Sequence, residues 1–264
     1  MPANLSVNKK DLIIEYFQKI LNNPYFILIN VLGILVLLAF LALSKKKKKK
    51  PEFLLPFVFV ITVAFYENFS SYLLVDKKLN EFFHGLITET PFQGWNLWVF
   101  NLFNYQISKV LLLLYVLVNV YGKTRRRALK ITILLFCLFC FFLQYFGILP
   151  LYSFQTIIYL MGNSALILAC GFYFIDLISH EKHLDTNPLK DWNFWGITLI
   201  LFQSSVIFLA DIAYSYLALN NVELYNFFNL VSQVLYVLLI LVLVFTIVSE
   251  IFFEFFKAKL NHDT

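Results

Sequence analysis

The sequence contains little charge, little glycine and few cysteines for its length, and each shortage excludes a class of protein. Only 14% of the 264 residues are charged, whereas about a quarter of a soluble domain is. Eight glycines are scattered along the chain without the spacing of a phosphate-binding loop, so we expect no nucleotide binding. The cysteines Cys137, Cys140 and Cys170 all fall within apolar runs, and this placement excludes a disulfide framework.

The chain also lacks the residue patterns of catalysis and of metal binding. His180 and His183 resemble the histidines of a zinc-binding helix, but the metalloprotease pattern needs them four residues apart and these are three apart. Cys137 and Cys140 have the spacing of a redox or metal motif, yet they lie in the middle of an apolar run. We therefore predict that the protein is not an enzyme and has no catalytic residue, no metal and no cofactor.

What the sequence does contain is an excess of apolar residues. They make up 60% of the chain, and the mean hydropathy is +0.75. A membrane-spanning helix needs about 20 predominantly apolar residues, so there is room for seven spans with short connections. We predict an all-α fold, a polytopic transmembrane seven-helix bundle. The apolar runs that define the spans are 25–44, 53–75, 97–121, 131–146, 154–178, 194–219 and 226–252.

The amino-terminal segment has a different pattern from the spans. Between Lys9 and Asn22, apolar residues recur at helical spacing opposite lysines and a glutamate, which predicts an amphipathic helix at the membrane interface. The predicted organisation is an interfacial segment over residues 1–24, a transmembrane domain over 25–256 and a short cytoplasmic tail over 257–264.

Two blocks of basic residues predict how the chain is threaded through the membrane. The segments 45–50 and 123–130 together hold 11 of the 21 basic residues. Basic residues beside a span are retained on the cytoplasmic side, where they also attract anionic lipid, so the net charge of +5 does not indicate nucleic acid. The amino terminus is then outside and the carboxyl terminus inside a bacterial cytoplasmic (inner) membrane. The predicted topology anchors are Lys45, Lys46, Lys47, Lys48, Lys49, Lys50, Arg125, Arg126 and Arg127.

Two familiar classes of seven-helix protein are excluded because the chain lacks a residue or a triplet that each class requires. Retinal proteins need a lysine in the seventh span to form a Schiff base, and no lysine occurs between Asn220 and Phe256. Receptors of the hormone-receptor type carry an acidic-arginine-aromatic triplet at the end of the third span, whereas this chain reads Asn119, Val120, Tyr121. We expect neither retinal nor that class of receptor.

Three charged residues interrupt the predicted spans at similar depth. Glu67, Lys109 and Asp211 lie about 13 to 16 Å from the outer ends of the second, third and sixth spans. Each alone would cost on the order of 3 kcal/mol in the membrane, so we predict that Lys109 pairs with at least one of the two carboxylates. The cluster either fixes helix register or forms the polar floor of a pocket that faces outside. Its predicted members are Glu67, Asn68, Tyr105, Gln106, Lys109, Gln203, Asp211 and Gln233.

Four stretches of scattered polar and aromatic residues resemble an uncharacterised protein family. They read FYENFSSY at 65–72, NLWVFNLFNYQ at 96–106, PLKDWNFWGITL at 188–199 and LYNFFNLVSQ at 224–233. Together they are similar to seven-helix membrane proteins common in Bacteroidetes-type bacteria, and the likeness covers most of the chain from Phe53 onward. Some members are loosely associated with neighbouring sensor kinases. The resemblance therefore implies a receptor-like role, without an activity that can be assigned to single residues.

Three functions stay open on the sequence alone. The favoured one is a sensory or regulatory protein that binds a small or lipidic ligand in the outer half of the bundle and acts on a separate cytoplasmic or membrane partner. A structural or assembly subunit of a membrane complex would use the same polar residues only to join helices. A small-molecule transporter should have helices broken by glycine or proline near the midplane, and Pro56 is the only proline within a predicted span.

Overall fold

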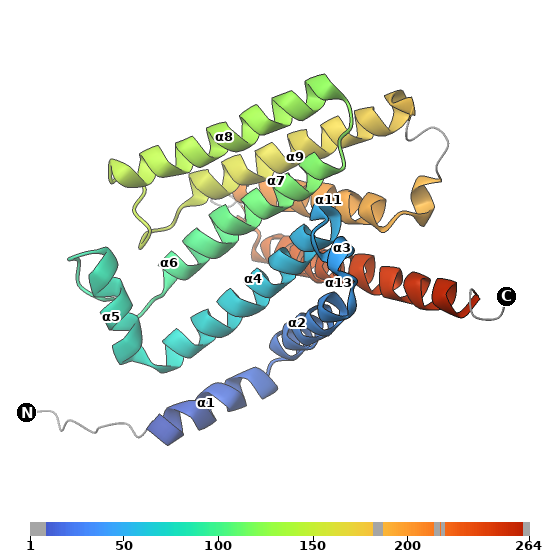
Figure 1. Cartoon of the computed structure of the whole chain (residues 1–264). Helices are drawn as coiled ribbons and strands as arrows, with labels where there is room; N and C mark the ends of the chain where they lie inside the picture. Colours follow the sequence, from blue (N-terminus) through green and yellow to red (C-terminus); the bar gives the residue numbers. More distant parts are fainter. Residues whose placement is uncertain (1–8, 182–186, 214–216, 218–219, 261–264) are drawn as a thin grey trace, which may run out of the picture.

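The computed structural model describes residues 9–181, 187–213, 217 and 220–260, and all regular elements among them are helices (Figure 1). Within these residues, seven helices are long and apolar enough to cross a membrane, which confirms the predicted bundle. The third span consists of three consecutive elements. The spans are α2 (Pro24–Ala42), α4 (Pro51–Val75), α6 (Leu97–Val99) with η1 (Phe100–Ile107) and α7 (Ser108–Val118), α8 (Lys123–Tyr145), α9 (Thr156–Ser179), α11 (Trp192–Ile212) and α13 (Val222–Leu260).

Shorter helices lie outside the spans. They are α1 (Lys9–Leu21), α3 (Lys45–Lys48), α5 (Lys77–Ile87) and η2 (Pro188–Lys190). α1 is the helix that the amphipathic pattern predicts, and none of its residues is buried. It packs against α2 and α4, and the Tyr16 hydroxyl donates a hydrogen bond to Asn68 of α4 at 2.9 Å.

Short sequence signals set where the first helices begin. Pro24 and Pro51 occupy the first turns of α2 and α4, where the missing N–H would have had no helical partner. The Asn23 side chain accepts a hydrogen bond from the Tyr25 amide at 3.0 Å, and Asp76 caps α5 in a similar way. The caps fix the start of α2 after α1 and the start of α5 after α4, and Pro51 marks the start of α4.

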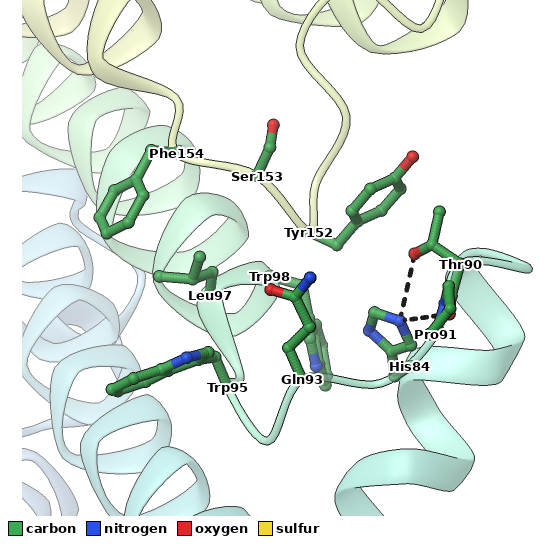
Figure 2. A pocket seen from close by; sticks show the side chains of 10 residues that line it. All are labelled: His84, Thr90, Pro91, Gln93, Trp95, Leu97, Trp98, Tyr152, Ser153 and Phe154. Atoms are coloured by element: carbon green, nitrogen blue, oxygen red, sulfur yellow. Dashed lines mark hydrogen bonds between the residues drawn. The ribbon is translucent and has the colours of Figure 1, made fainter.

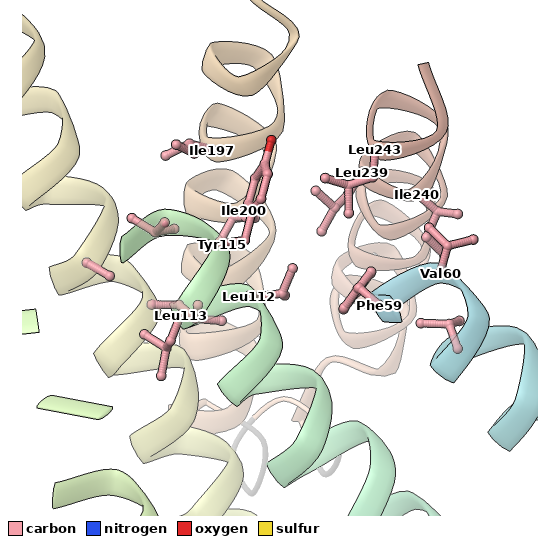
Figure 3. Packing of buried hydrophobic residues seen from close by; sticks show 14 of the residues in the cluster. Phe59, Val60, Leu112, Leu113, Tyr115, Ile197, Ile200, Leu239, Ile240 and Leu243 are labelled. Carbon is pink, nitrogen blue, oxygen red and sulfur yellow. The ribbon is translucent and has the colours of Figure 1, made fainter. Parts of the chain in front are cut away.

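The centre of the bundle lies where α4, α7, α11 and α13 meet (Figure 3). Phe59, Tyr115, Ile200 and Leu239 are almost completely buried there. One contact requires a glycine, because a Cβ atom on Gly196 would lie 2.8 Å from the Tyr115 hydroxyl oxygen. Lipid tails are as apolar as these side chains, so close packing rather than escape from water holds the helices together.

Both basic blocks lie at the same end of the bundle, which we call the basic end. The Lys47 ammonium of α3 pairs with Glu250 and, at 3.0 Å, with Glu254, both in the carboxyl-terminal part of α13. Arg125 at the start of α8 pairs with Asp176 near the end of α9 at 2.7 Å. Figure 1 shows α3 and the start of α8 at the same end of the bundle, so the two predicted groups of anchors lie together there. That this end is cytoplasmic stays a prediction.

The third span departs from the regular α-helix that the sequence predicts. Its residues 100–107 form a π-helix, which contains Asn101, Asn104 and Gln106. No glycine or proline marks the segment, so the sequence offered no local signal for it. π-helical turns are rare and occur often at functional sites.

Several helix boundaries also differ from the predicted spans. α11 ends at Ile212 rather than at position 219, and α13 runs for 39 residues to Leu260 rather than ending at 252. α8 begins at Lys123, eight residues before its apolar run. The last two extensions consist largely of residues that favour helix, with no glycine or proline, so the helices continue beyond their apolar parts.

Candidate functional site

A polar cavity of about 170 Å³ lies between the helices in the half away from the basic end, and it is partly open to the surface of the bundle. It is similar in size to a cavity that holds benzene. All of its lining residues except Ile207 carry a polar group, an expensive arrangement inside a membrane that usually marks function. The lining residues, from α2, α4, η1, α9, α11 and α13, are Tyr25, Tyr66, Glu67, Asn104, Tyr159, Gln203, Ile207, Asn229, Ser232, Gln233 and Tyr236.

Glu67 provides the carboxylate of this cavity. Its side chain is nearly buried, and its Oε1 accepts a hydrogen bond from the Tyr25 hydroxyl at 2.8 Å. None of the ion pairs among the described residues includes Glu67. A carboxylate buried without a cation is costly, so this arrangement favours the approach of a positive charge or a proton.

Two further predicted residues, Gln203 and Gln233, line the same cavity. Gln203 is only 4% exposed, and its Oε1 has no hydrogen-bond partner among the described residues. Gln233 lies at the lipid-facing edge and is exposed. Below them the hydroxyl groups of Tyr66 and Tyr236 are 3.0 Å apart and form a hydrogen bond between α4 and α13. The cavity thus contains a buried acceptor without a donor among the described residues, while two of its four tyrosines bond to each other.

Lys109 lies beside the cavity and has partners other than Glu67. Its ammonium donates to Asn163 Oδ1 at 2.7 Å and lies 4.8 Å from the centre of the Tyr159 ring. Tyr105 stacks on Tyr159, with ring centres 4.2 Å apart. The side chain of the other predicted partner, Asp211, is outside the described residues, so that pairing stays a prediction. Lys109 and Tyr105 therefore support one wall of the cavity through Tyr159.

Two members of the predicted cluster lie elsewhere. Asn68 donates to Asn30 at 2.9 Å and accepts from Tyr16, and it thereby joins α1, α2 and α4. Gln106 donates to Gln155 at 3.2 Å and lines a groove beside α8. Equal depth in the membrane does not fix burial or the face of the helix that a residue occupies, since Glu67, Lys109 and Gln203 are buried, Asn68, Tyr105 and Gln106 are only partly buried, and Gln233 is exposed.

Two asparagines of the π-helix η1, Asn101 and Asn104, contact different parts of the structure. Asn104 lines the polar cavity. Asn101 is buried and donates to the carbonyl oxygens of Leu151 and Ser153, both at 2.6 Å, so it holds the connection between α8 and α9. The irregular segment therefore joins the cavity wall to an end of the bundle.

A larger hollow of about 660 Å³ lies at the end opposite the basic end (Figure 2). The loop after α5 and the connection before α9 form it, and His84 Nε2 lies 3.0 Å from the Thr90 carbonyl oxygen at one side. Trp95 and Phe154 are largely exposed on its rim. Its lining contains no carboxylate and no ammonium group, so it offers aromatic surface rather than charge.

The predicted anchors at the basic end fall into two groups. Lys47 and Arg125 make the ion pairs described above, and Lys50 pairs with Glu52 at 3.3 Å. Burial alone would lower the pKa of Lys47, but its hydrogen bonds to the two glutamates of α13 outweigh this and raise the pKa. The remaining anchors that are exposed, and so available to anionic head groups, are Lys45, Lys46, Lys49, Arg126 and Arg127.

Comparisons of the chain with protein families, with curated proteins and with solved structures found no match. The resemblance to the Bacteroidetes-type family therefore stays a prediction. Arguments about function rest on the geometry of the cavity.

The sequence-based prediction included none of the tyrosines and asparagines that line the cavity. A signal was present in the seventh span, where Asn229, Gln233 and Tyr236 are spaced by four and three residues and so lie on one helical face. Tyr66 directly precedes Glu67, but neighbours in a helix point in different directions, so only the packing shows that both reach the cavity. Tyr25 looked like the start of a span, and nothing in the sequence connects it with Glu67.

Proposed function

We propose that the protein is a sensory or regulatory seven-helix membrane protein that binds a small ligand in the polar cavity and acts on a separate cytoplasmic partner. The course of α13 carries this proposal. The helix lines the cavity through Asn229, Ser232, Gln233 and Tyr236 and then continues without a break to the basic end. A ligand that contacts these side chains touches the same rigid element that reaches the opposite surface.

The contacts of α13 at the basic end support a regulatory role. Glu250 and Glu254 hold Lys47, so a shift of α13 would change how the basic block is presented. A ligand shifts such an equilibrium only if it binds one position of the helix better than the other. In the orientation that the basic residues predict, the changed surface faces the cytoplasm of the cell.

A transporter is the second candidate, and the π-helix favours it. Transporters bind substrates where helices are irregular, and Asn104 of η1 lines the cavity. Transport would require a path from the cavity to the basic end, where Tyr115, Leu239 and Leu243 are packed and buried. This packing makes the regulatory role the better supported of the two.

The proposal is tested by asking what the protein retains when it is purified in lipid nanodiscs. We expect mass spectrometry to find a small molecule with the wild type that is absent from Ser232→Phe, which fills the cavity. Leu230→Phe is the matched control, because Leu230 is 59% exposed on the same helix and lines no cavity described here. If the two variants and the wild type retain the same compounds, the cavity is not a ligand site.

The retained compound then separates regulation from transport. A regulator should co-purify with a cytoplasmic protein whose captured amount differs between the wild type and Ser232→Phe, whereas Leu230→Phe should behave as the wild type. A transporter should instead move the compound across the bilayer of sealed liposomes. Flux without such a partner would replace the regulatory proposal by the second candidate.

A further inference from the structure

An apolar groove of about 280 Å³ adjoins the polar cavity on the surface of the bundle. Tyr25 and Gln233 line both hollows, so these two side chains form the boundary between them. The other groove residues, on α2 and α13, are apolar. They are Pro24, Leu28, Val234, Val237 and Leu238. Val234 and Leu238 are 51% and 42% exposed, so in a membrane the groove faces the lipid tails.

We propose that the ligand is a single-chain amphiphile with a protonated amine head group. It enters from the bilayer between α2 and α13, with its head in the polar cavity and its chain in the groove. This inference rests on the proposed function and names the ligand class of the same site.

The head group is assigned from the chemistry of the cavity. The Glu67 carboxylate has one hydrogen bond, from Tyr25, and no ion-pair partner among the described residues. Gln203 Oε1 is a buried acceptor that lacks a donor in the same part of the chain. An ammonium group supplies up to three N–H donors and a positive charge, and the faces of tyrosine rings attract it as well. An anion would be repelled by the Glu67 carboxylate, and a neutral head would leave that carboxylate without a counter-charge unless Glu67 takes up a proton.

The chain is assigned from the position of the groove. An apolar segment attached to a head at Glu67 can leave the cavity past Tyr25 and Gln233, and it then meets only apolar side chains. Moving an alkyl chain from lipid to this groove gains little free energy, since both surroundings are apolar. The groove therefore orients the chain, while the head group determines which amphiphile binds.

The first experiment compares three probes with the same chain in phosphatidylcholine nanodiscs: dodecylamine, dodecan-1-ol and dodecanoate. Thermal unfolding is followed by tryptophan fluorescence. At a concentration about a hundred times its dissociation constant, dodecylamine should raise the wild-type melting temperature by roughly 5 °C. The alcohol and the carboxylate should produce little rise. Equal stabilisation by the amine and the alcohol, with both effects abolished in Ser232→Phe, would overturn the amine assignment and leave the proposed function intact.

Glu67→Gln is the decisive variant, because it keeps the shape of the side chain and removes the charge. It should increase the dodecylamine concentration needed for half of the stabilisation by at least about tenfold. Glu52→Gln at the basic end makes the same chemical change away from the cavity and should leave the dodecylamine response unchanged. The melting temperature without a probe verifies that each variant is folded. A dodecylamine response that is the same in Glu67→Gln and in the wild type would overturn the inference.

A second measurement locates the chain. A dodecylamine with a diazirine at the end of its chain should label peptides of α2 or α13 at the groove. Val234→Trp, which fills the groove, should reduce this labelling, whereas Leu230→Trp should not. Labelling confined to other helices would overturn the proposed route.

If none of the three probes stabilises the wild type, the amphiphile inference is overturned. The proposed function is then decided separately by the compounds that the wild type retains and Ser232→Phe does not.

Discussion

The two ends of the bundle differ in how completely their buried polar groups are hydrogen-bonded. At the basic end, the buried Asp176 accepts hydrogen bonds from the backbone amides of Tyr121 and Gly122 and from Arg125, at 2.7 to 3.0 Å. In the other half, buried polar atoms of the described residues lack hydrogen-bond partners in α5, α9 and α11 and at the ends of α6 and α8. Their side chains include Asn80, Trp98, Gln144, Asn163, Gln203 and Ser204.

The buried Asp176 at the basic end is fully hydrogen-bonded, whereas several buried polar atoms in the other half have no hydrogen-bond partner among the described residues. Buried polar groups are usually hydrogen-bonded, so several unpartnered ones in one region call for an explanation, such as a ligand. The basic end needs no such explanation. The small size of Gly122 allows Asp176 to approach the backbone, since a Cβ atom on Gly122 would lie 2.5 Å from Asp176 Oδ1.

The largest expected effect concerns which end faces the cytoplasm, since the labelling outcome is all-or-none. In a variant without Cys137, Cys140 and Cys170, a cysteine at Glu223 should react with an impermeant thiol reagent on intact cells. A cysteine at Arg127 should react only after the cells are opened. Both positions are exposed. The reverse pattern would place the cavity half inside the cell and contradict the predicted orientation.

Removing the Asp176 carboxylate should destabilise the basic end of the bundle. Asp176→Ala leaves two backbone amides and Arg125 without their acceptor, and we expect a loss of about 3 to 5 kcal/mol in unfolding free energy. Thermal and denaturant unfolding in a lipid mimetic measure it. Arg126→Ala, a neighbouring exposed basic residue, serves as the control and should change stability by less than about 0.5 kcal/mol. Similar losses in the two variants would show that Asp176 has no special role.

Substitution of Lys109 tests whether its ammonium group interacts with Asn163 or with Glu67. Lys109→Met removes a charged hydrogen bond to Asn163, and we expect a loss of about 2 kcal/mol. A double-mutant cycle with Asn163→Leu should give a coupling of about 1 kcal/mol, and a cycle with Glu67→Gln should be additive within about 0.5 kcal/mol. A strong coupling to Glu67 would mean that these charges pair after all.

The smallest expected effect concerns Lys47. Its pairs with Glu250 and Glu254 are partly exposed, so Lys47→Met should cost about 0.5 to 1 kcal/mol, and the difference should shrink in 1 M salt. Lys46→Met, on the exposed side of the same block, is the matched control and should not change stability. If the two lysine variants have the same stability, the contact between α3 and α13 does not stabilise the basic end.

The bundle was predictable because the membrane imposes a simple rule on length and polarity. Seven apolar runs and two basic blocks sufficed for the fold class and for placing both blocks at one end. The extension of α13 was not predicted, since polarity marks where a helix leaves the lipid and not where it ends. The π-helix at 100–107 was not predicted, since its segment contains no glycine or proline, and the hydrogen bond of Asn101 to Leu151 joins residues 50 positions apart, which no local pattern encodes.

The cavity was predictable only in part. Of the residues that depth counting grouped together, Glu67, Gln203 and Gln233 line the cavity. Depth counting could not assign partners, since a rotation of one helix by a single residue exchanges the side chains that meet. Tyr25 reaches Glu67, and Asn163 reaches Lys109, through such rotational details.

The length of α13 has a mechanical consequence. Its 39 residues extend for about 58 Å, almost twice the roughly 30 Å thickness of the hydrocarbon core of a bilayer. The helix therefore resembles a lever arm. Its cavity contacts lie in its first half, its middle is packed in the core at Leu239 and Leu243, and its last turn and a half lies past the Lys47 pairs with Glu250 and Glu254. If the helix tilts as one rigid rod about its packed middle, a displacement at the cavity moves its last turns in the opposite direction, at the surface where we propose that a partner binds.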